Sequence, residues 1–386
     1  MRVLVAFDKF KDSLTAVEAC SAAARAILQH APGTEVDACP LSDGGEGFAP
    51  LLTRSAGGTE RRVEVTGPLG ARVTAALGEV QLGRVPAGAR EALGLSGTQA
   101  GTLALADMAS ASGLALLDRG QRDPLRTSTV GTGQLILAAA RLHPAALLLG
   151  VGGSATHDLG LGALGALGIG FRDPAGRPIP EIVPGDWPRL AGLEGAVAPA
   201  PPILIACDVD NPVLGPRGAL AVYGRQKGLR ESDAPALEAQ TSRVVRLVCG
   251  HFGKHESLAA QAGAGAAGGI AFGLMAGCGA GIVPGFDLVA SWLDLKARIR
   301  AADVVVTGEG RFDDSSLSGK GPGSVASWAA AEGKPVHVFA GQVALSRPVP
   351  GIEARAITPQ GMELGLALAQ ADRLLSAAVA AMFAAR

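Results

Sequence analysis

The sequence has few cysteines and almost no net charge, and each shortage excludes a class of protein. Its 386 residues include only five cysteines, none of them in a CxxC pair, which argues against both a disulfide framework and a zinc site. The formal net charge is −1, so there is no electrostatic reason to expect nucleic acid or an anionic membrane as a partner. Without disulfides to form, we expect the chain to work in the reducing cytoplasm.

Long hydrophobic runs are also missing. The apolar stretch near the N-terminus, residues 3–7, ends at Asp8 and is too short for a signal peptide. Residues 257–286 carry no charge, and their glycines recur every four residues, as in membrane-helix dimers. This segment is mostly alanine and glycine, which would insert poorly into a bilayer. We therefore predict a close-packed helix inside a globular protein.

Common catalytic signatures are absent as well. The sequence has no GxxxxGK[ST], HRD, DFG, HExxH or GxSxG motif, which excludes P-loop, protein-kinase, zincin and nucleophile-elbow mechanisms. Lysine is scarce, with seven among 34 basic residues. The lysines that stand close to glycine or hydroxyl residues are therefore of interest, namely Lys11, Lys227 and Lys320.

Glycine, in contrast, is abundant at 55 residues, and many glycines follow short apolar runs, as in tight turns between strands and helices. The first forty residues predict a strand at 3–7, a helix at 15–29 capped by Ser13 or Thr15, and a strand at 36–41. Residues 62–75 alternate around a Gly-Pro turn, which predicts an antiparallel hairpin. Further strands are predicted at residues 103–106, 145–149, 203–206, 304–306 and 336–339.

These elements predict an α/β fold with two domains. Strand–helix alternation at both ends of the chain indicates a parallel α/β domain formed by residues 1–58 and 286–386. Residues 59–285 are expected to form a second, mixed-sheet α/β domain inserted into the first. Ligands of parallel sheets lie beyond the carboxyl ends of the strands, and in this sequence polar loops follow those ends.

Three of these loops are acidic: residues 42–47, 207–212 and 308–314. Mg²⁺ needs one or two carboxylates together with phosphate oxygens, and a hydroxyl nucleophile can use an aspartate as its base. A single aspartate after a strand is usually a turn or cap residue. Three acidic loops in one chain nevertheless favour a metal-assisted site that handles phosphate.

Two glycine-rich stretches match dinucleotide-binding patterns. Residues 150–155 match GxGxxA after a predicted strand, with Asp173 at a suitable distance to bind a ribose, whereas residues 263–268 match GxGxxG without a preceding strand. A nicotinamide cofactor is therefore one hypothesis. A phosphate bound to the backbone N–H groups of residues 152–156 is favoured over it, and a tight turn without a ligand stays open.

Nine ordered motifs together carry a family resemblance. They span residues 6–13 (Ala-Phe-Asp-Lys-Phe-Lys-Asp-Ser), 40–47 (Pro-Leu-Ser-Asp-Gly-Gly-Glu-Gly), 65–70, 122–133, 150–158, 206–212, 222–228, 263–269 and 307–313 (Thr-Gly-Glu-Gly-Arg-Phe-Asp). In this order they resemble the type I glycerate kinase family over nearly the whole chain. The resemblance implies ATP- and Mg²⁺-dependent phosphorylation of glycerate, typically at the 2-hydroxyl. It also implies a flavodoxin-like α/β domain that carries a second, inserted α/β domain.

Four positions depart from the family pattern. Lys9 and Asp12 stand where serine and glycine are usual, Phe48 replaces a small hydroxyl residue, and His157 replaces asparagine. The changes at Lys9 and Asp12 alter either phosphate contacts or only the turn.

The resemblance assigns roles to the acidic residues. We expect transfer of the ATP γ-phosphoryl group to D-glycerate in a cleft between the two domains. Asp43 is the predicted general base, with Glu309 and Asp313 as alternatives, and Asp208 and Asp210 are the predicted Mg²⁺ ligands.

Phosphate and the substrate carboxylate require positive charge and hydrogen-bond donors. Lys11, Arg311 and Lys320 are assigned to these groups. The other predicted contacts are Ser13, Gly44, Gly45, Glu46, Gly152, Gly153, Ser154, Thr156 and Asn211. The sequence leaves regiochemistry and a homodimer open. The alternatives to a kinase are a sensor that binds a sugar acid or nucleotide without catalysis, and a dehydrogenase.

Overall fold

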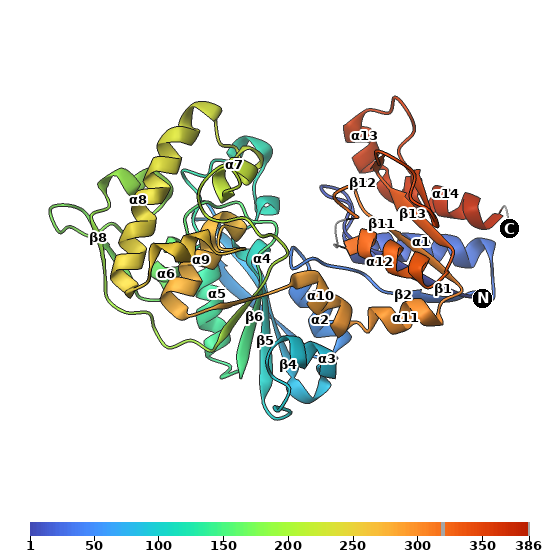
Figure 1. Ribbon diagram of the computed structural model, residues 1–386, viewed down its shortest axis with the longest axis horizontal. Helices are drawn as coiled ribbons and strands as arrows, with labels where there is room; N and C mark the ends of the chain where they lie inside the picture. Colours follow the sequence, from blue (N-terminus) through green and yellow to red (C-terminus); the bar gives the residue numbers. More distant parts are fainter. Residues whose placement is uncertain (318–320, 385–386) are drawn as a thin grey trace. The chain divides into compact units, whose positions relative to one another are not determined.

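The chain divides into two compact units. The computed structural model describes residues 1–317 and 321–384. Unit 1 comprises Met1–Asp43 and Val289–Arg386, and unit 2 is the continuous stretch Gly44–Leu288 (Figure 1). Residues 44–58, expected in the first domain, belong to unit 2. Helix α10 (Gly285–Trp292) contains the second passage of the chain between the units.

Unit 1 contains a five-stranded parallel sheet in the order β15-β13-β11-β1-β2. Counted along the chain within the unit, this is the order 2-1-3-4-5, which is the flavodoxin-like arrangement. The predicted flavodoxin-like α/β domain is thus confirmed. The strands are β1 (Arg2–Phe7), β2 (Glu35–Ala38), β11 (Val304–Gly308), β13 (Val336–Ala340) and β15 (Ile352–Ala356), and a separate parallel pair is formed by β12 (Arg311–Asp313) and β14 (Gln342–Ala344).

Helices cover both faces of this sheet. Alternate strand residues point to opposite faces, and Val3 and Val5 of β1 share one hydrophobic cluster with residues of α1 (Ala16–His30) and α14 (Ala371–Ala384). The other face receives α12 (Gly321–Ala331), which contacts β1, β11 and β13. Two shorter helices complete the unit, α11 (Leu295–Ala301) and α13 (Leu364–Ala369).

Thr15 determines where α1 begins. Its side chain accepts a hydrogen bond from the Glu18 backbone N–H (3.2 Å), and the Glu18 carboxylate accepts one from the Thr15 N–H (2.8 Å). This reciprocal pair is a capping box, which satisfies donors that the first turn leaves free. Of the two predicted N-caps, Thr15 is therefore the correct one.

Unit 2 contains the predicted mixed sheet, in the order β10-β9-β6-β5-β4-β3. The first four strands are parallel, while β4 pairs antiparallel with both β5 and β3. The predicted hairpin is confirmed, with Val65 opposite Val73. The strands are β3 (Thr59–Thr66), β4 (Arg72–Gln81), β5 (Thr102–Asp107), β6 (Ala146–Gly150), β9 (Ile203–Ala206) and β10 (Gly281–Val283), with a small separate pair of β7 (Gly170–Arg172) and β8 (Gly192–Glu194).

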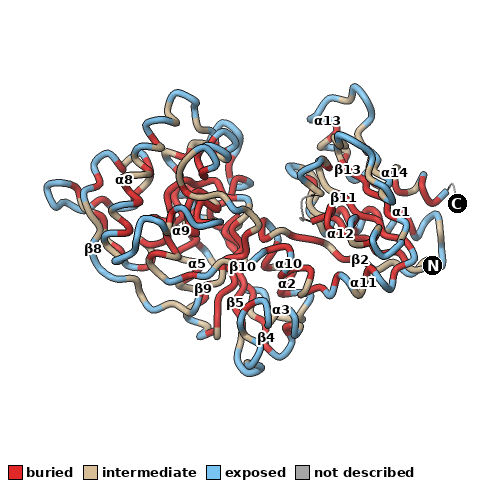
Figure 2. Tube along the Cα trace, viewed as in Figure 1, coloured by how far each residue is buried: buried red, intermediate tan, exposed pale blue. Residues whose placement is uncertain are grey.

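The core of unit 2 lies between this sheet and its helices. Strands β5, β6 and β9 are buried along almost their whole length (Figure 2). A second apolar cluster surrounds the fully buried Trp187 and includes residues of the long helix α8 (Ala234–Phe252). The helices are α2 (Phe48–Ser55), α3 (Ala87–Ala92), α4 (Met108–Ser112), α5 (Val130–Ala140), α6 (Leu161–Ala166), α7 (Ala219–Tyr223), α8 (Ala234–Phe252) and α9 (Ala266–Cys278).

The uncharged segment 257–286 is not one continuous helix. It contains a 3₁₀ turn, then α9, then β10, and the backbone of Ala267–Gly269 is left-handed inside α9. Gly273 lies so close to the Leu159 carbonyl that a Cβ there would approach it to 2.2 Å. The recurring glycines therefore permit close packing, as predicted. None of the helices among the described residues combines the length and hydrophobicity that crossing a membrane requires.

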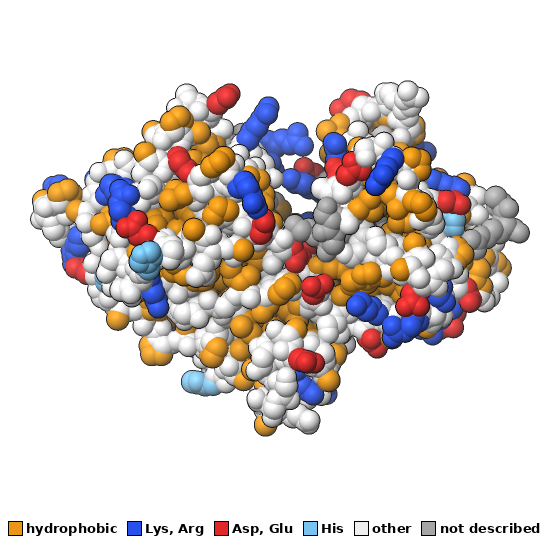
Figure 3. Space-filling view, in the orientation of Figure 1, with side chains coloured by type: hydrophobic (Ala, Val, Ile, Leu, Met, Phe, Trp, Pro, Cys, Tyr) orange, Lys and Arg blue, Asp and Glu red, His pale blue; other side chains and the backbone are white. Residues whose placement is uncertain are grey.

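Charged side chains of both signs occur over each unit on the face drawn in Figure 3. This mixed distribution agrees with the net charge of −1.

Ion pairs that join residues distant in sequence help to hold unit 1 together. Asp37 of β2, for example, accepts hydrogen bonds from Arg2 (3.3 Å) and Arg298 (2.5 Å).

Candidate active site

The topology of unit 1 points to one edge of its sheet. In a flavodoxin-like sheet, ligands bind beyond the carboxyl ends of the strands where the strand order reverses, between the first and third strands. Here these are β1 and β11, whose following loops are in contact. The Asp8 N–H donates to the Gly308 carbonyl (3.0 Å), and a Cβ on Gly310 would lie 3.3 Å from the backbone nitrogen of Lys11.

Acidic side chains gather at this switch point around Lys9. The Lys9 ammonium lies 3.4 Å from an oxygen of Asp43 and 4.0 Å from one of Asp8. Glu309, from the loop after β11, is close enough to Asp8 and Asp43 for mutual repulsion. We call Asp8, Lys9, Asp43 and Glu309 the switch-point cluster. Sequence reasoning missed Asp8, although an acid directly after the first strand was a usable signal.

Two carboxyl groups of the cluster hold protons more tightly than usual. Burial raises the pKa of Glu309 to about 7, and repulsion from Asp8, Asp313 and Asp43 adds to the rise. Burial also raises the pKa of Asp8 to about 6, which Lys9 opposes and Asp43 reinforces. Glu309 consequently exchanges its proton near neutral pH, which suits a general acid or base.

These raised pKa values predict a pH effect on stability. The unfolded chain releases the same protons near pH 4, so the folded state gives up stability as pH rises from about 4 to about 7. We expect unit 1 of the wild type to lose about 2–3 kcal/mol over this range relative to Glu309→Gln. Urea denaturation of both proteins at pH 5 and pH 8 measures the difference. An equal pH dependence in the two proteins would contradict the shift at Glu309.

The predicted cationic residues of unit 1 lie on the neighbouring loops. Lys11 is exposed, and Arg311 is held by Asp313 (3.0 Å) and Gln342 (3.4 Å). Ser13 instead anchors the loop, since its hydroxyl donates to the Leu368 carbonyl (2.8 Å). Lys320 lies outside the described residues.

Asp313, the other alternative base predicted from the sequence, accepts hydrogen bonds from two neighbouring side chains. The Ser315 hydroxyl donates to it at 2.6 Å and the Arg311 guanidinium at 3.0 Å. These two hydrogen bonds lower the pKa of Asp313. A carboxylate stabilised in this way takes up a proton less readily at neutral pH.

In unit 2, the loop that begins at Gly44 packs against the ends of the central strands. The Gly152 N–H donates to the Gly44 carbonyl (3.0 Å), and a Cβ on Gly152 would lie 2.7 Å from the Gly45 Cα. The buried carboxylate of Asp107 accepts hydrogen bonds from the N–H groups of Gly47 and Ala49, at the start of α2. Of the contacts predicted here, Gly44 and Gly45 are buried, whereas Glu46 is exposed.

The loop Gly152–Thr156 follows β6 and is fixed by residues from distant motifs. Thr127 donates to the Ala155 carbonyl (3.1 Å), and Lys227 reaches Ser154 and Thr156. Asp158, just after the loop, is fully buried. Its carboxylate accepts hydrogen bonds from four donors, the N–H groups of Thr129, Gly160 and Gly162 and the Thr129 hydroxyl. Neither Lys227 nor Asp158 was in the predicted site.

The second glycine-rich stretch, residues 263–269, packs against the first. A Cβ on Gly268 would lie 2.0 Å from the Thr156 carbonyl oxygen, and the Leu159 N–H donates to the Gly268 carbonyl (3.1 Å). Gly265 in turn lies against the backbone of Asn211 and Pro212. These glycines are explained by backbone contact, so the GxGxxG match requires no dinucleotide.

A substitution tests this packing. Gly268→Ala is expected to destabilise unit 2 by about 2–4 kcal/mol, because the added methyl group overlaps the Thr156 carbonyl and the residue has φ +75°. Gly279→Ala is the matched control, with φ +66° but nothing within 4 Å of its Cβ. Its cost should stay near about 1 kcal/mol. Denaturant unfolding measures both, and equal costs would contradict the close contact at Gly268.

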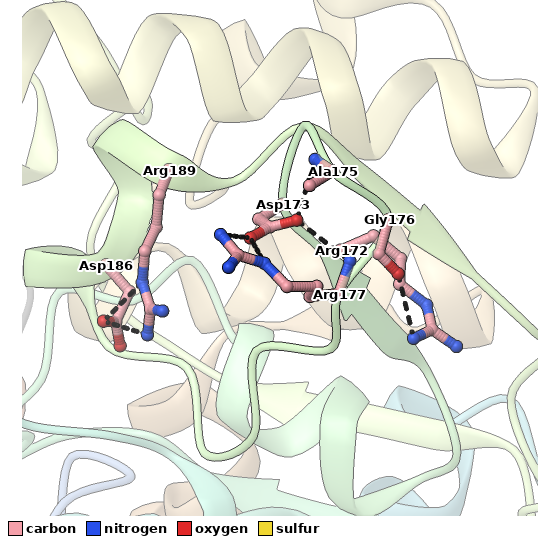
Figure 4. A network of polar contacts seen from close by, with 7 residues as sticks. All are labelled: Arg172, Asp173, Ala175, Gly176, Arg177, Asp186 and Arg189. Atoms are coloured by element: carbon pink, nitrogen blue, oxygen red, sulfur yellow. Dashed lines mark hydrogen bonds and ion pairs between the residues drawn. The ribbon is translucent and has the colours of Figure 1, made fainter.

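Asp173, which the dinucleotide hypothesis assigned to a ribose, closes a local turn instead. Its carboxylate accepts hydrogen bonds from the backbone N–H groups of Ala175 and Arg177 (both 2.9 Å) and from the Arg177 guanidinium (2.8 Å). Figure 4 shows this arrangement just after β7, beside a separate pair of Asp186 and Arg189. The Arg177 backbone bond is the main cause of the lowered pKa of Asp173.

Comparison with known proteins identifies the family. A model of the glycerate kinase family matches residues 3–385 of this chain. The chain belongs to the glycerate kinase family. Among its relatives, a glycerate kinase of Halalkalibacterium halodurans is 36% identical over 97% of this chain and 96% of its own. A glycerate 2-kinase of Escherichia coli is 35% identical over 89% of this chain and 86% of its own.

A solved structure is similar over the whole length of this glycerate kinase family member. It is the crystal structure of a candidate glycerate kinase 2 from Salmonella typhimurium, with 34% identity and a TM-score of 0.73, covering 100% of this chain and 98% of that one. The α/β class with a parallel and a mixed sheet is therefore shared within the family.

The residues predicted to bind Mg²⁺ in this glycerate kinase family member already have protein partners. Both oxygens of Asp208 accept hydrogen bonds from the Phe286 N–H in α10 (3.1 and 2.9 Å), and Asp210 pairs with Arg217 (2.6 Å). Asn211 bonds Tyr223 and the Arg217 carbonyl. Within residues 1–317 and 321–384, no three acidic, histidine or cysteine side chains are grouped as a metal site. The pair fits only an Mg²⁺ ion whose other ligands are phosphate oxygens and water.

Proposed function

We propose that this protein transfers the γ-phosphoryl group of ATP to the 2-hydroxyl of glycerate. The observation that carries the proposal is the switch-point cluster, since carboxylates with raised pKa values stand where a flavodoxin-like sheet binds its ligand. Membership of the glycerate kinase family supports the substrate, and a relative named glycerate 2-kinase supports the 2-position. A cytoplasmic location stays a prediction from the sequence.

In the proposed reaction, a carboxylate takes the proton of the attacking hydroxyl. We assign this role to Asp43, whose side chain is 45% exposed and lies beside the Lys9 ammonium. Glu309 is the competing base, because its pKa of about 7 is better matched to neutral pH. The proton moves from the glycerate oxygen to the carboxylate as the new oxygen–phosphorus bond forms and the bond to ADP breaks.

Charge neutralisation is the second requirement of phosphoryl transfer. We assign Lys11, Arg311 and Lys320 to the phosphates and the glycerate carboxylate, and the backbone of residues 152–156 to one of these anions. Asp208 and Asp210 would hold Mg²⁺, which supplies positive charge to the phosphate oxygens of ATP.

The test is ADP release from ATP and Mg²⁺ with D-glycerate, with an EDTA control and phosphorus NMR of the product. Chelator-sensitive formation of 2-phosphoglycerate is the expected result. Formation of 3-phosphoglycerate would retain the kinase and overturn the 2-position. Binding of nucleotide without turnover of D-glycerate, L-glycerate or related hydroxy acids would overturn the kinase in favour of a sensor.

The Mg²⁺ assignment makes its own prediction. Asp208→Asn should lower kcat by about a hundredfold or more, because a metal-bound charge is lost while the amide oxygen still accepts the Phe286 N–H. Steady-state kinetics across a range of Mg²⁺ concentrations measures the effect. Asp210→Asn tests the second carboxylate in the same way. Turnover of Asp208→Asn within about threefold of the wild type would remove Asp208 from the metal site.

A further inference from the structure

Lys227 is a buried lysine that the proposed reaction has not used. Only 3% of its surface is exposed, and its ammonium donates to the Ser154 hydroxyl oxygen (2.8 Å) and the Thr156 carbonyl (2.6 Å). Both acceptors belong to the loop after β6, 73 and 71 residues earlier in the chain. Since burying an ammonium group is costly, its position beneath this loop needs an explanation.

The backbone around Lys227 is fixed from both sides. The Lys227 N–H donates to the Gly224 carbonyl, and Gly228 has φ +92°. A Cβ on Gly228 would lie 2.0 Å from the Arg122 carbonyl oxygen, so only glycine allows this approach. The turn that carries Lys227 therefore packs against the backbone of Arg122.

The Lys227 ammonium is not neutralised by a direct ion pair within the described residues. Among the described residues, no carboxylate lies within ion-pair distance of its ammonium. Asp158 is near enough to favour the charged form, but its carboxylate already accepts four hydrogen bonds. His157 is neutral, because burial and Lys227 lower its pKa to about 3. Burial lowers the pKa of Lys227 itself to about 7.

Two hydroxyl groups of the loop, those of Ser154 and Thr156, can form further hydrogen bonds. Ser154 Oγ accepts from Lys227, so its own hydrogen remains able to donate in another direction. Thr156 Oγ1 is buried and has no hydrogen-bond partner among the described residues. An unsatisfied buried hydroxyl is unfavourable unless a ligand or water completes it.

We propose that Lys227 is a positioning residue for anion binding at residues 152–156: it orients the Ser154 hydroxyl toward the anion and supplies positive charge beneath the loop. This inference rests on the proposed function only in that the loop takes a phosphate or carboxylate of ATP or glycerate. His157 and Asp158, which directly follow the loop, are the titratable groups near Lys227, and Arg225 is the other charged residue of its own turn.

The experiment compares Lys227→Met with Lys254→Met, which removes the same charge from an exposed site of unit 2. We measure the dissociation constants of ATP and of D-glycerate by calorimetry at pH 6 and pH 8, together with KM and kcat. Lys227→Met is expected to weaken binding of one of the two anions at least tenfold at pH 6, with kcat within about threefold. The difference from Lys254→Met should shrink at pH 8, where Lys227 of the parent has lost most of its charge.

A second variant covers the case in which Lys227→Met does not fold. Ser154→Ala keeps Lys227 and removes only the hydroxyl donor, and it should weaken binding of the same anion. Unchanged dissociation constants in either folded variant, or equal losses at both pH values in Lys227→Met, would overturn the inference. A wild type that binds both anions without turnover would overturn the proposed function alone, and a wild type that binds neither would overturn both.

Discussion

Replacing Asp43 with asparagine is expected to lower kcat by about 10²–10⁴-fold, because an amide cannot take the proton of the attacking hydroxyl. Asparagine keeps the shape of the side chain and an oxygen that still accepts from Lys9, which lies 3.4 Å from Asp43. KM for both substrates should therefore change little. Steady-state kinetics with ATP and D-glycerate between pH 6 and pH 8.5 measures the effect.

Two further variants are needed, one as a control and one to test the competing base. Glu332→Gln removes an exposed carboxylate from the turn after α12 of the same unit, away from the switch-point cluster. Its kcat should stay within about twofold of the wild type. Glu309→Gln tests the competing base. If the large loss occurs in Glu309→Gln while Asp43→Asn stays within about threefold, the role belongs to Glu309.

Replacing Asp158 with alanine should destabilise unit 2 by about 3–5 kcal/mol, because it leaves four buried donors without an acceptor. Asp158 binds the backbone at the starts of both α5 and α6, so the loss affects two helices. Burial raises the pKa of its carboxyl group, and the four hydrogen bonds oppose that rise. Urea denaturation followed by circular dichroism measures the change.

The control for Asp158 is a carboxylate without such contacts. Glu91 lies on the exposed side of α3, and Glu91→Gln should change the free energy of unfolding by less than about 0.5 kcal/mol. Asp158→Asn separates charge from shape, since one oxygen is replaced by an amide group that points its own donors at N–H groups. A cost below about 1 kcal/mol for Asp158→Ala would mean that water replaces the carboxylate.

Local features of the fold were predictable from the sequence. Strand β9 has the predicted bounds, residues 203–206, and the helix predicted at 15–29 begins after Thr15. Such elements depend on apolar runs and on cap residues within a few positions, which a single sequence displays directly. The parallel sheet built from both ends of the chain also followed from strand–helix alternation.

Long-range polar partners were not predictable in the same way. Lys227 stands out in the sequence as one of only seven lysines, but nothing in the sequence links it to Ser154. In the same motif, His157 stands out because it departs from the family pattern, but it is buried beside Thr241 (3.3 Å). Its neighbour Asp158 is the residue that accepts four hydrogen bonds. Which buried charge meets which loop depends on how the strands are ordered, and a single sequence does not display that order.

The position of β1 in its sheet has a consequence for synthesis on the ribosome. This buried strand lies between β2 and β11, and β11 is some three hundred residues later in the chain. Unit 2 is continuous, so all of its residues are synthesised before β11, the pairing partner of β1. During this interval the nascent chain carries an apolar strand with an open edge, the kind of segment that chaperones protect from aggregation. Chains released before residue 304 would keep that edge permanently exposed.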